Sequence, residues 1–360
     1  MSSAMSSRRS GKGRSVPVNP FIAVCRDTQK RFGQILKSDV RVRNGIKNTK
    51  HYDWTYPCRD SGCKTAPKNN TTIEFYNRDT IDCARQLQLR GLKVAAMNMA
   101  NPDTPTNWES GARAQEECLM YRSTYALSLD EEYEIFKGRQ WSYPLKEIGG
   151  VYSPDNLVIK DCNFEMYERK EMFYMDFVAI AGLRGPETKK KRMVYEYDIE
   201  TTKEKMRAFF RICHMNSVDC PVAGALGCGV FGNPPEHIGL LWSEVINEPE
   251  FRHMFKVIVF AILDGKTTNN FGILQDRIKF NDSKDDTDNE IDWDTIDELA
   301  DLEEQELRLK YHEANIGTDG FFNRSGDQSP HIPSVPTTSP SDSPYTTSPF
   351  QFTFSIHTQS

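Results

Sequence analysis

Short apolar segments alternate with segments of helical periodicity between residues 19 and 280. Where apolar residues recur every three or four positions, the spacing predicts an amphipathic helix. The other segments are rich in β-branched residues, and the later ones, such as Phe255–Leu263 (FKVIVFAIL), are nearly continuous apolar runs. Strands of this kind are typically buried on both faces, as in parallel sheets. The alternation therefore predicts an α/β fold in which helices cover both faces of a mainly parallel sheet.

The individual elements can be assigned from this pattern. We expect helices at Phe21–Leu36, Thr80–Leu89, Ala112–Ser123, Thr202–Met215 and Pro235–Glu248. We expect strands at Thr71–Tyr76, Lys93–Asn98, Asn156–Ile159, Met175–Ala181, Cys220–Leu226 and Phe255–Leu263.

Composition divides the chain into four parts. Residues 1–18 form a basic tail that we expect to be disordered, and residues 19–280 form the α/β domain. Residues 281–324 are acidic and then amphipathic, and residues 325–360 are a Pro/Ser/Thr-rich tail that we also expect to be disordered. The amphipathic segment either binds a partner protein or packs on its own domain, and the C-terminal tail is a second candidate for protein contacts.

Charge and hydropathy limit the classes of partner. Fourteen acidic and three basic residues between Asp282 and Glu313 leave the remainder mildly basic, which is compatible with an anionic ligand. No stretch is long and apolar enough to span a bilayer, and the N-terminus lacks the apolar region of a signal peptide. We therefore expect an intracellular protein, cytoplasmic or nuclear, with reduced cysteines, no membrane partner and no direct DNA binding.

A glycine-rich segment, GALGCGVFGNPP (Gly224–Pro235), follows a predicted buried strand and precedes a predicted helix. Glycines let a backbone turn tightly and approach a ligand closely. Successive N–H groups can then bind one anion, and a helix N-terminus behind them adds to the attraction. An ordinary glycine-rich turn has the same composition, and the spacing of the glycines alone favours neither interpretation. The segment lacks the GxxxxGK[ST] pattern of an ATPase phosphate loop.

A second informative segment carries Gln115, Glu116 and Glu117 at the start of a predicted helix. Adjacent helical residues point about 100° apart, so the two glutamates cannot flank one bond as the acids of an ordinary glycosidase do. One glutamate can instead act as acid and then base while the other holds the substrate. A solvated helix face has the same composition, and composition alone favours that interpretation.

Together the motifs resemble the microbial-type poly(ADP-ribose) glycohydrolases, a branch of the macrodomain superfamily. The resemblance rests on QEE, on GALGCGVFGNPP and on further segments in the same order, namely IEFYNRDTIDCARQL, GARAQEECLMYRSTYALSL, GVYSPDNLVIKD and VFAI. It spans about residues 19–280. It implies a three-layer α/β/α macrodomain with a mixed sheet, which binds ADP-ribose and hydrolyses O-glycosidic ribose bonds of poly(ADP-ribose) or of ADP-ribosylated proteins.

The resemblance also implies roles for individual residues. Glu117 is similar to the catalytic acid of the family, and Glu116 and Gln115 are similar to its positioning partners. Asp79 resembles the aspartate that receives the adenine amino group, and Asn101 the asparagine near the distal ribose. The residues that resemble the diphosphate loop, with the aromatic residue beside the distal ribose, are Gly227, Cys228, Gly229, Val230, Phe231, Gly232 and Asn233. No metal and no cofactor is implied.

The chain departs from the family pattern immediately before QEE. Where the family has consecutive glycines, this chain has Thr106, Asn107 and Trp108. Trp108 either stacks on a base or ribose or blocks the cleft. The intact QEE and GCGVFGN motifs favour a hydrolase, whereas the altered loop leaves a non-catalytic ADP-ribose reader and a degenerate scaffold as alternatives. The basic run Lys189–Arg192 (KKKR) is expected to be a solvated loop between strands rather than a polymer-binding patch.

Overall fold

The computed structural model describes residues 19–54, 69–105, 107–129 and 143–281. The chain divides into two compact units, Met1–Ile291 and Asp292–Ser360. All described residues belong to the first unit. The basic N-terminal tail, the acidic segment beyond residue 281 and the C-terminal tail lie outside the described residues.

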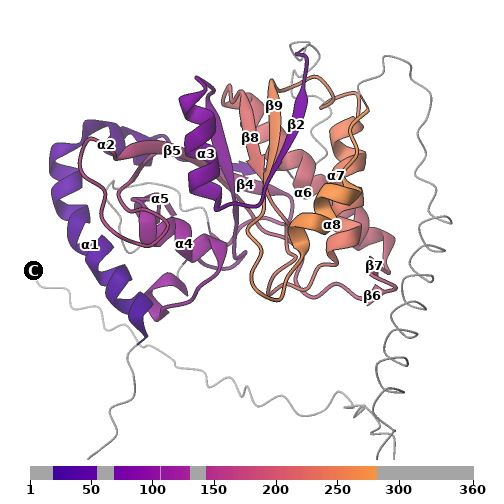
Figure 1. The fold of residues 1–360 in the computed structure, drawn as a ribbon, viewed down its shortest axis with the longest axis horizontal. Coiled ribbons are helices and arrows are strands. Elements are labelled where there is room, and N and C mark those ends of the chain that lie inside the picture. Colours follow the sequence, from indigo (N-terminus) through magenta and orange to yellow (C-terminus); the bar gives the residue numbers. More distant parts are fainter. Residues whose placement is uncertain (1–18, 55–68, 106, 130–142, 282–360) are drawn as a thin grey trace, which may run out of the picture. The chain divides into compact units, whose positions relative to one another are not determined.

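The first unit is built on a seven-stranded sheet with the order β1-β4-β5-β3-β8-β9-β2 (Figure 1). Strands β2, β9, β8, β3 and β5 are parallel neighbours, whereas β4 runs antiparallel to both β5 and β1. A second sheet pairs β6 with β7. The strands are β1 Lys50–Asp53, β2 Thr72–Tyr76, β3 Val94–Met99, β4 Gly149–Val158, β5 Phe173–Ile180, β6 Thr188–Lys189, β7 Arg192–Met193, β8 Cys220–Ala223 and β9 Val257–Ala261.

Helices cover both faces of this mixed sheet. The helices are α1 Pro20–Ser38, α2 Val40–Lys47, α3 Thr80–Leu89, the 3-10 helix η2 Asn107–Ser110, α4 Gln115–Arg122, α5 Ala126–Leu129, α6 Glu196–Met215, α7 Pro235–Asn247 and α8 Asn270–Arg277. No helix in the described part of the chain is both long enough and apolar enough to traverse a lipid bilayer.

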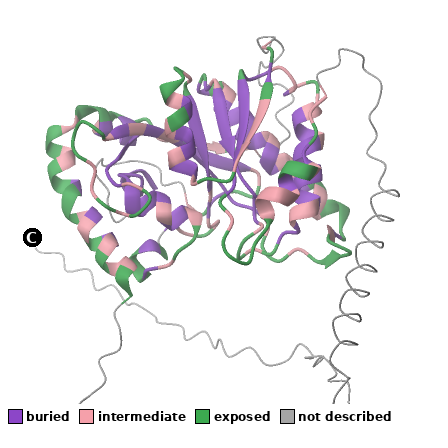
Figure 2. Ribbon diagram, viewed as in Figure 1, coloured by how far each residue is buried: buried purple, intermediate pink, exposed green. Residues whose placement is uncertain are grey.

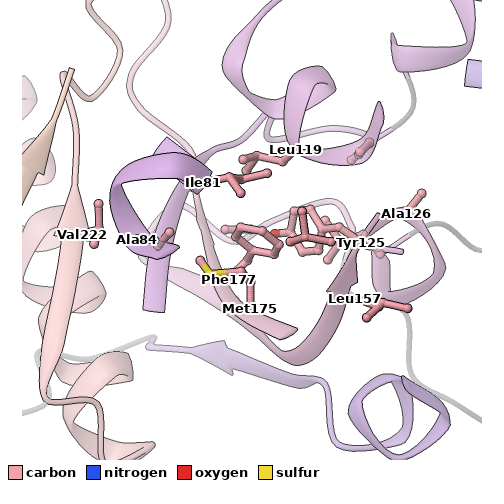
Figure 3. Close-up of a cluster of buried hydrophobic side chains, with 14 of the residues drawn as sticks. Ile81, Ala84, Leu119, Tyr125, Ala126, Leu157, Met175, Phe177 and Val222 are labelled. Atoms are coloured by element: carbon pink, nitrogen blue, oxygen red, sulfur yellow. The ribbon is translucent and has the colours of Figure 1, made fainter. Parts of the chain in front are cut away.

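Two apolar cores lie on opposite faces of the sheet. One contains side chains of α1 to α5 and the other contains side chains of α6, α7 and α8. Figure 2 shows the central strands as buried along their lengths. In Figure 3, Ile81, Leu119 and Phe177 from α3, α4 and β5 point into the first core. The expected three-layer α/β/α arrangement is confirmed.

Several elements differ from the sequence-based prediction. The sheet is mixed, as the resemblance implies, but its antiparallel strand β4, which lies between β5 and β1, is longer than expected. Only Asn156–Ile159 was expected as a strand there, since Gly149, Gly150 and Pro154 are usually strand breakers. Pro154 lies in an irregular stretch of register between Ser153 and Asn156, whereas Gly149 and Gly150 pair regularly with Asp53 and Tyr52 of β1.

The helix expected at Ala112–Ser123 begins three residues later, at Gln115. Gly111 has φ of +86°, outside the helical region, and the N-cap Ala114 is extended. Conversely, α6 begins at Glu196, six residues before the expected Thr202. Helix α2 and strand β1 were not expected, because each is too short for its periodicity to be distinctive.

Candidate active site

The carboxyl ends of β3, β5 and β8 lie at one edge of the sheet, because β3 is parallel to both of its neighbours. The segments that follow these strands are residues 100–105, 181–185 and 224–233. In open α/β sheets, ligands bind at this edge. The candidate residues on these three segments, together with the first turn of α4, are therefore brought together.

Gln115 attaches the start of α4 to the end of β3. Its Oε1 accepts from the backbone N–H of Met99 at 3.0 Å, and its Nε2 donates to the carbonyl of Met97 at 2.7 Å. Nε2 also lies 3.4 Å from Oγ1 of Thr80 on α3. Both ends of the Gln115 amide are therefore engaged by protein.

Glu116 is a buried carboxyl group, 4% exposed, surrounded by hydrogen-bond donors. Its Oε1 accepts from Nδ2 of Asn98 at 3.0 Å and from the hydroxyl of Tyr143 at 3.4 Å. Its Oε2 accepts from the backbone N–H of Asn101 at 3.0 Å. Desolvation by burial raises the pKa of Glu116 to about 7, although the hydrogen bond from Asn98 opposes this change. Glu116 therefore positions the Asn101 loop and can exchange a proton near neutral pH.

Glu117 also lies in the first turn of α4 and is 5% exposed. Its Oε2 accepts from the backbone N–H of Ala114 at 2.8 Å, which satisfies one donor at the helix N-terminus. Within the described part of the chain, Oε1 of Glu117 accepts no hydrogen bond. One carboxylate oxygen is therefore held by protein and the other remains for a ligand.

Asn101 follows β3 and faces the segment after β5. Its Oδ1 accepts from the backbone N–H groups of Asp103 and Thr104 at 2.9 and 3.4 Å. It also accepts from Nη2 of Arg184 at 2.8 Å. Nη1 of Arg184 forms an ion pair with Asp103 at 2.6 Å, and the guanidinium carbon lies 5.2 Å from the ring centroid of Phe231.

Arg184 was not predicted as a site residue, although it connects the Asn101 loop to the glycine-rich loop. It stands alone in the sequence LRGP and belongs to no motif. The available signal was the position of Arg184 shortly after β5, the strand that pairs with β3. A cation at this place is compatible with a neighbouring anion-binding site.

The glycine-rich loop is folded around Asn233, which is 2% exposed. Nδ2 of Asn233 lies 2.7 Å from the carbonyl of Leu183 and 3.1 Å from that of Gly227. Gly227 has φ of +74°, and a Cβ there would lie 2.4 Å from the Asn233 amide. The position therefore requires glycine for two reasons.

Three successive N–H groups at the tip of this loop remain available. The backbone N–H groups of Gly229, Val230 and Phe231 donate to no other described residue. Val230 is 95% exposed. The Sγ of Cys228 points inward instead, and burial raises its pKa far above the usual thiol value. A tip with free amide groups in front of the N-terminus of α7 can bind a phosphate group.

Asp79 caps the N-terminus of α3. Its Oδ1 accepts from the backbone N–H groups of Ile81 and Asp82 at 2.9 and 3.2 Å. Arg122, which is 1% exposed, forms ion pairs with Asp79 at 2.5 Å and with Asp82 at 2.6 Å. Among the described residues, every hydrogen bond to the Asp79 side chain is to Oδ1, which leaves Oδ2 for a ligand. Asp79 is thus the helix cap that its position suggests, and its adenine role stays a prediction.

Trp108 neither stacks on a ligand nor blocks the cleft. Its side chain is fully buried in the core between α1 and α4. The ring centroid lies 6.2 Å from that of Phe32 and 5.9 Å from that of Tyr121. The Tyr121 hydroxyl lies 2.7 Å from the Trp108 carbonyl, which holds η2 against α4. The expectation was wrong because the amphipathic α1 supplies an apolar surface that a large aromatic side chain can cover.

Part of the chain matches a known protein family. Residues 27–161 match the family model of the microbial-type PARG catalytic domain, where PARG denotes poly(ADP-ribose) glycohydrolase. No curated protein matches the chain. The earlier resemblance is thereby confirmed by a match that includes Asp79, Asn101 and QEE.

Solved structures show the same fold. Poly(ADP-ribose) glycohydrolase from Thermomonospora curvata aligns with TM-score 0.57 and 23% identity, covering 72% of this chain and 99% of that one. The enzyme from Deinococcus radiodurans in complex with ADP-ribose aligns with TM-score 0.53 and 21% identity, covering 66% of this chain and 96% of that one. The fold of this chain is that of the poly(ADP-ribose) glycohydrolases.

Proposed function

We propose, from the match to the microbial-type poly(ADP-ribose) glycohydrolase catalytic domain, that this chain binds ADP-ribose and hydrolyses O-glycosidic ribose bonds. The substrate is poly(ADP-ribose) or an ADP-ribosylated protein. The observation that carries the proposal is the arrangement at one sheet edge of a carboxyl group with a free oxygen, Glu117, and a loop tip with free amides, Gly229–Phe231.

Recognition of ADP-ribose divides among the candidate residues. The free N–H groups of Gly229–Phe231 bind the diphosphate, and the cation of Arg184 adds to the attraction. Oδ2 of Asp79 accepts from the adenine amino group. The ring of Phe231 and the amide of Asn101, which Arg184 already links, lie beside the distal ribose.

The reaction follows from general acid–base chemistry at Glu117. Its protonated carboxyl donates to the departing ribose oxygen as the bond to the anomeric carbon breaks. Positive charge then develops on the anomeric carbon, and the nearby diphosphate stabilises it. The Glu117 carboxylate next accepts a proton from the attacking water, which restores the acid. Glu116 holds the Asn101 backbone in place during both steps.

One observation favours a non-catalytic reader as the alternative. The segment before QEE is a 3-10 helix, η2, held in the core by Trp108, rather than the glycine loop of the family pattern. Residues with side chains take up more space than the glycines of the family pattern. They allow ADP-ribose to bind but restrict the approach of the scissile bond to Glu117.

Two measurements separate the two functions. One is the release of ADP-ribose from poly(ADP-ribose), and the other is the binding of ADP-ribose, followed by calorimetry. We expect wild type to release product and Glu117→Gln to lose at least about 100-fold in rate while still binding. Glu165→Gln, at an exposed position outside the site, serves as the matched control and stays active. Binding without release by wild type would establish the reader, and absence of binding would reject both functions.

A further inference from the structure

Beyond the candidate site, a basic hairpin projects from its rim. Residues 184–195 (RGPETKKKRMVY) contain five basic side chains and one acidic side chain. The strands β6 and β7 pair Thr188 with Met193 and Lys189 with Arg192, which leaves Lys190 and Lys191 as a two-residue turn. Lys189, Lys190 and Lys191 are exposed. The run expected to be a solvated loop is therefore an ordered turn that concentrates positive charge.

The turn has an unusual backbone conformation. Lys190 and Lys191 have φ of +47° and +61°. Two-residue hairpins with positive φ at both positions favour Asn and Gly, because a Cβ is unfavourable there. A residue with a side chain adopts this backbone conformation only where the surrounding structure stabilises it. Such residues often occur at functional sites.

Both ends of the hairpin are attached to the candidate site. On the incoming side, the backbone N–H of Gly185 donates to the carbonyl of Phe231 at 2.8 Å. On the outgoing side, the backbone N–H of Met193 donates to Nδ1 of His237 at 2.9 Å, and Lys191 forms an ion pair with Glu236 at 3.2 Å. Glu236 and His237 lie in the first turn of α7, directly after the glycine-rich loop. Figure 1 shows β6 and β7 below α7.

Exposed aromatic rings continue the surface beyond the basic turn. Tyr195 is 54% exposed and Tyr197 is 65% exposed. Their hydroxyl groups donate to Glu187 at 2.7 Å and to Glu147 at 2.9 Å, which leaves the rings on the surface. The lysines of the turn and the two exposed rings can therefore divide the recognition of a single-stranded polyanion that carries bases, because cations attract the phosphates and rings stack on bases.

We propose that the β6–β7 hairpin, with Lys189 and Lys190 at its tip, binds poly(ADP-ribose). It contacts the part of the polymer that extends beyond the ADP-ribose unit held in the candidate active site. Each further unit of that polymer supplies a pyrophosphate for the cations and an adenine for the tyrosines. The inference rests on the proposed function and adds to it a second contact surface for the polymer, outside the candidate active site. The hairpin lies outside the residues that match the family model, 27–161.

The test uses Lys189→Gln/Lys190→Gln in the full chain. Binding of labelled poly(ADP-ribose) of one fractionated length is titrated at several salt concentrations in the Glu117→Gln background, so that the polymer is not consumed. We expect polymer affinity to fall about fivefold to tenfold and the slope of log Kd against log salt to fall by about 1.4 to 2, because two cations are removed. Affinity for ADP-ribose, measured by calorimetry, stays within about twofold of wild type.

The matched control is Arg169→Gln/Lys170→Gln, which removes the same charge from adjacent exposed residues. These precede β5 and so lie at the opposite edge of the sheet from the candidate site. The control is expected to keep the polymer affinity of its parent. Equal polymer affinity for the hairpin variant and the control overturns the hairpin proposal, as does an equal loss of polymer and ADP-ribose binding by the hairpin variant.

Two further outcomes separate this proposal from its premise. If the parent chain binds neither ADP-ribose nor polymer, the proposed function fails and the hairpin proposal fails with it. A competition with single-stranded RNA gives the second outcome. If RNA displaces the polymer from the parent chain, and the hairpin substitutions weaken RNA binding more than polymer binding, the surface binds RNA and the hairpin proposal is overturned. Thermal unfolding of each variant identifies any loss of affinity that comes from misfolding.

Discussion

The guanidinium of Arg184 lies over the ring of Phe231, 5.2 Å from its centroid, while donating from Nη2 to Asn101 at 2.8 Å. One side chain thus links the loops that follow β3, β5 and β8. Because the three loops are far apart in sequence, their relative positions at the site depend on this contact and on the sheet beneath it.

Replacing Arg184 tests its part in ligand binding. We expect Arg184→Ala to weaken ADP-ribose binding about tenfold, because it removes a cation near the diphosphate and releases Asn101 and Phe231. Isothermal calorimetry measures the change. Arg169→Ala removes another exposed arginine, at the opposite edge of the sheet, and should bind normally. Unchanged affinity in Arg184→Ala would assign that residue a purely structural role.

Glycine substitutions test the approach of the ligand to the loop. A Cβ at Gly229 meets no atom within 4 Å in the free protein, so Gly229→Ala should change stability by less than about 0.5 kcal/mol. The same Cβ occupies the space proposed for the diphosphate, and we expect ADP-ribose affinity to fall at least about tenfold. Calorimetry and denaturant unfolding measure the two effects.

Gly227→Ala provides the contrast to Gly229→Ala. It combines a positive φ with a contact of 2.4 Å to Asn233 and should destabilise the fold as well. Gly91→Ala carries a similar φ of +81° with nothing within 4 Å, and it should show the backbone cost alone. If Gly229→Ala binds ADP-ribose as wild type does, the free amides are not the diphosphate site.

Substitution of Trp108 separates a core role from a ligand role. We expect Trp108→Ala to destabilise the fold by about 3–5 kcal/mol, because it leaves a cavity between α1 and α4. Trp108→Phe keeps an aromatic ring there and should leave ADP-ribose affinity within about twofold of wild type. Denaturant unfolding and calorimetry check the pair. A stable Trp108→Phe variant with strongly reduced affinity would restore a stacking role.

The buried carboxyl of Glu116 makes stability depend on pH. Since its pKa is about 7 in the folded protein and lower when unfolded, the folded state binds the extra proton between about pH 4.5 and 7. Stability from this group therefore falls as pH rises through that window, by about 3 kcal/mol in all. Denaturant unfolding at pH 5 and 7.5 should show a smaller difference for Glu116→Gln than for wild type. Equal differences would contradict the assignment.

The adenine role of Asp79 can be separated from its structural role by comparison with Asp82. Both carboxylates pair with Arg122, at 2.5 and 2.6 Å. Asp79→Asn and Asp82→Asn should therefore destabilise the fold to a similar degree. Only Asp79→Asn should weaken binding of ADP-ribose while leaving the affinity for ribose 5-phosphate, which has no adenine, unchanged. Equal effects of the two variants on ADP-ribose binding would reject the adenine contact.

Local patterns were sufficient for elements whose contacts are mainly with their own neighbours. Helix α3 was predicted at Thr80–Leu89 and occurs there, because Asp79 caps it and its apolar spacing is regular. Strand β3 and helix α7 were each predicted to within one residue of their observed limits. The ordered motifs also identified the family resemblance, since each motif combines a local turn with residues of specific chemistry.

Tertiary structure alone decided the remaining features, because they depend on residues distant in sequence. The antiparallel β4 is stabilised by pairing with β5 and β1. Trp108 is buried because α1 covers it, and the raised pKa of Glu116 comes from burial beneath the Asn101 loop. Arg184 reaches Asn101 across 83 residues of sequence. Desolvation and long-range contact have no local signature, so composition and periodicity determined the layers and motifs, whereas packing determined the site.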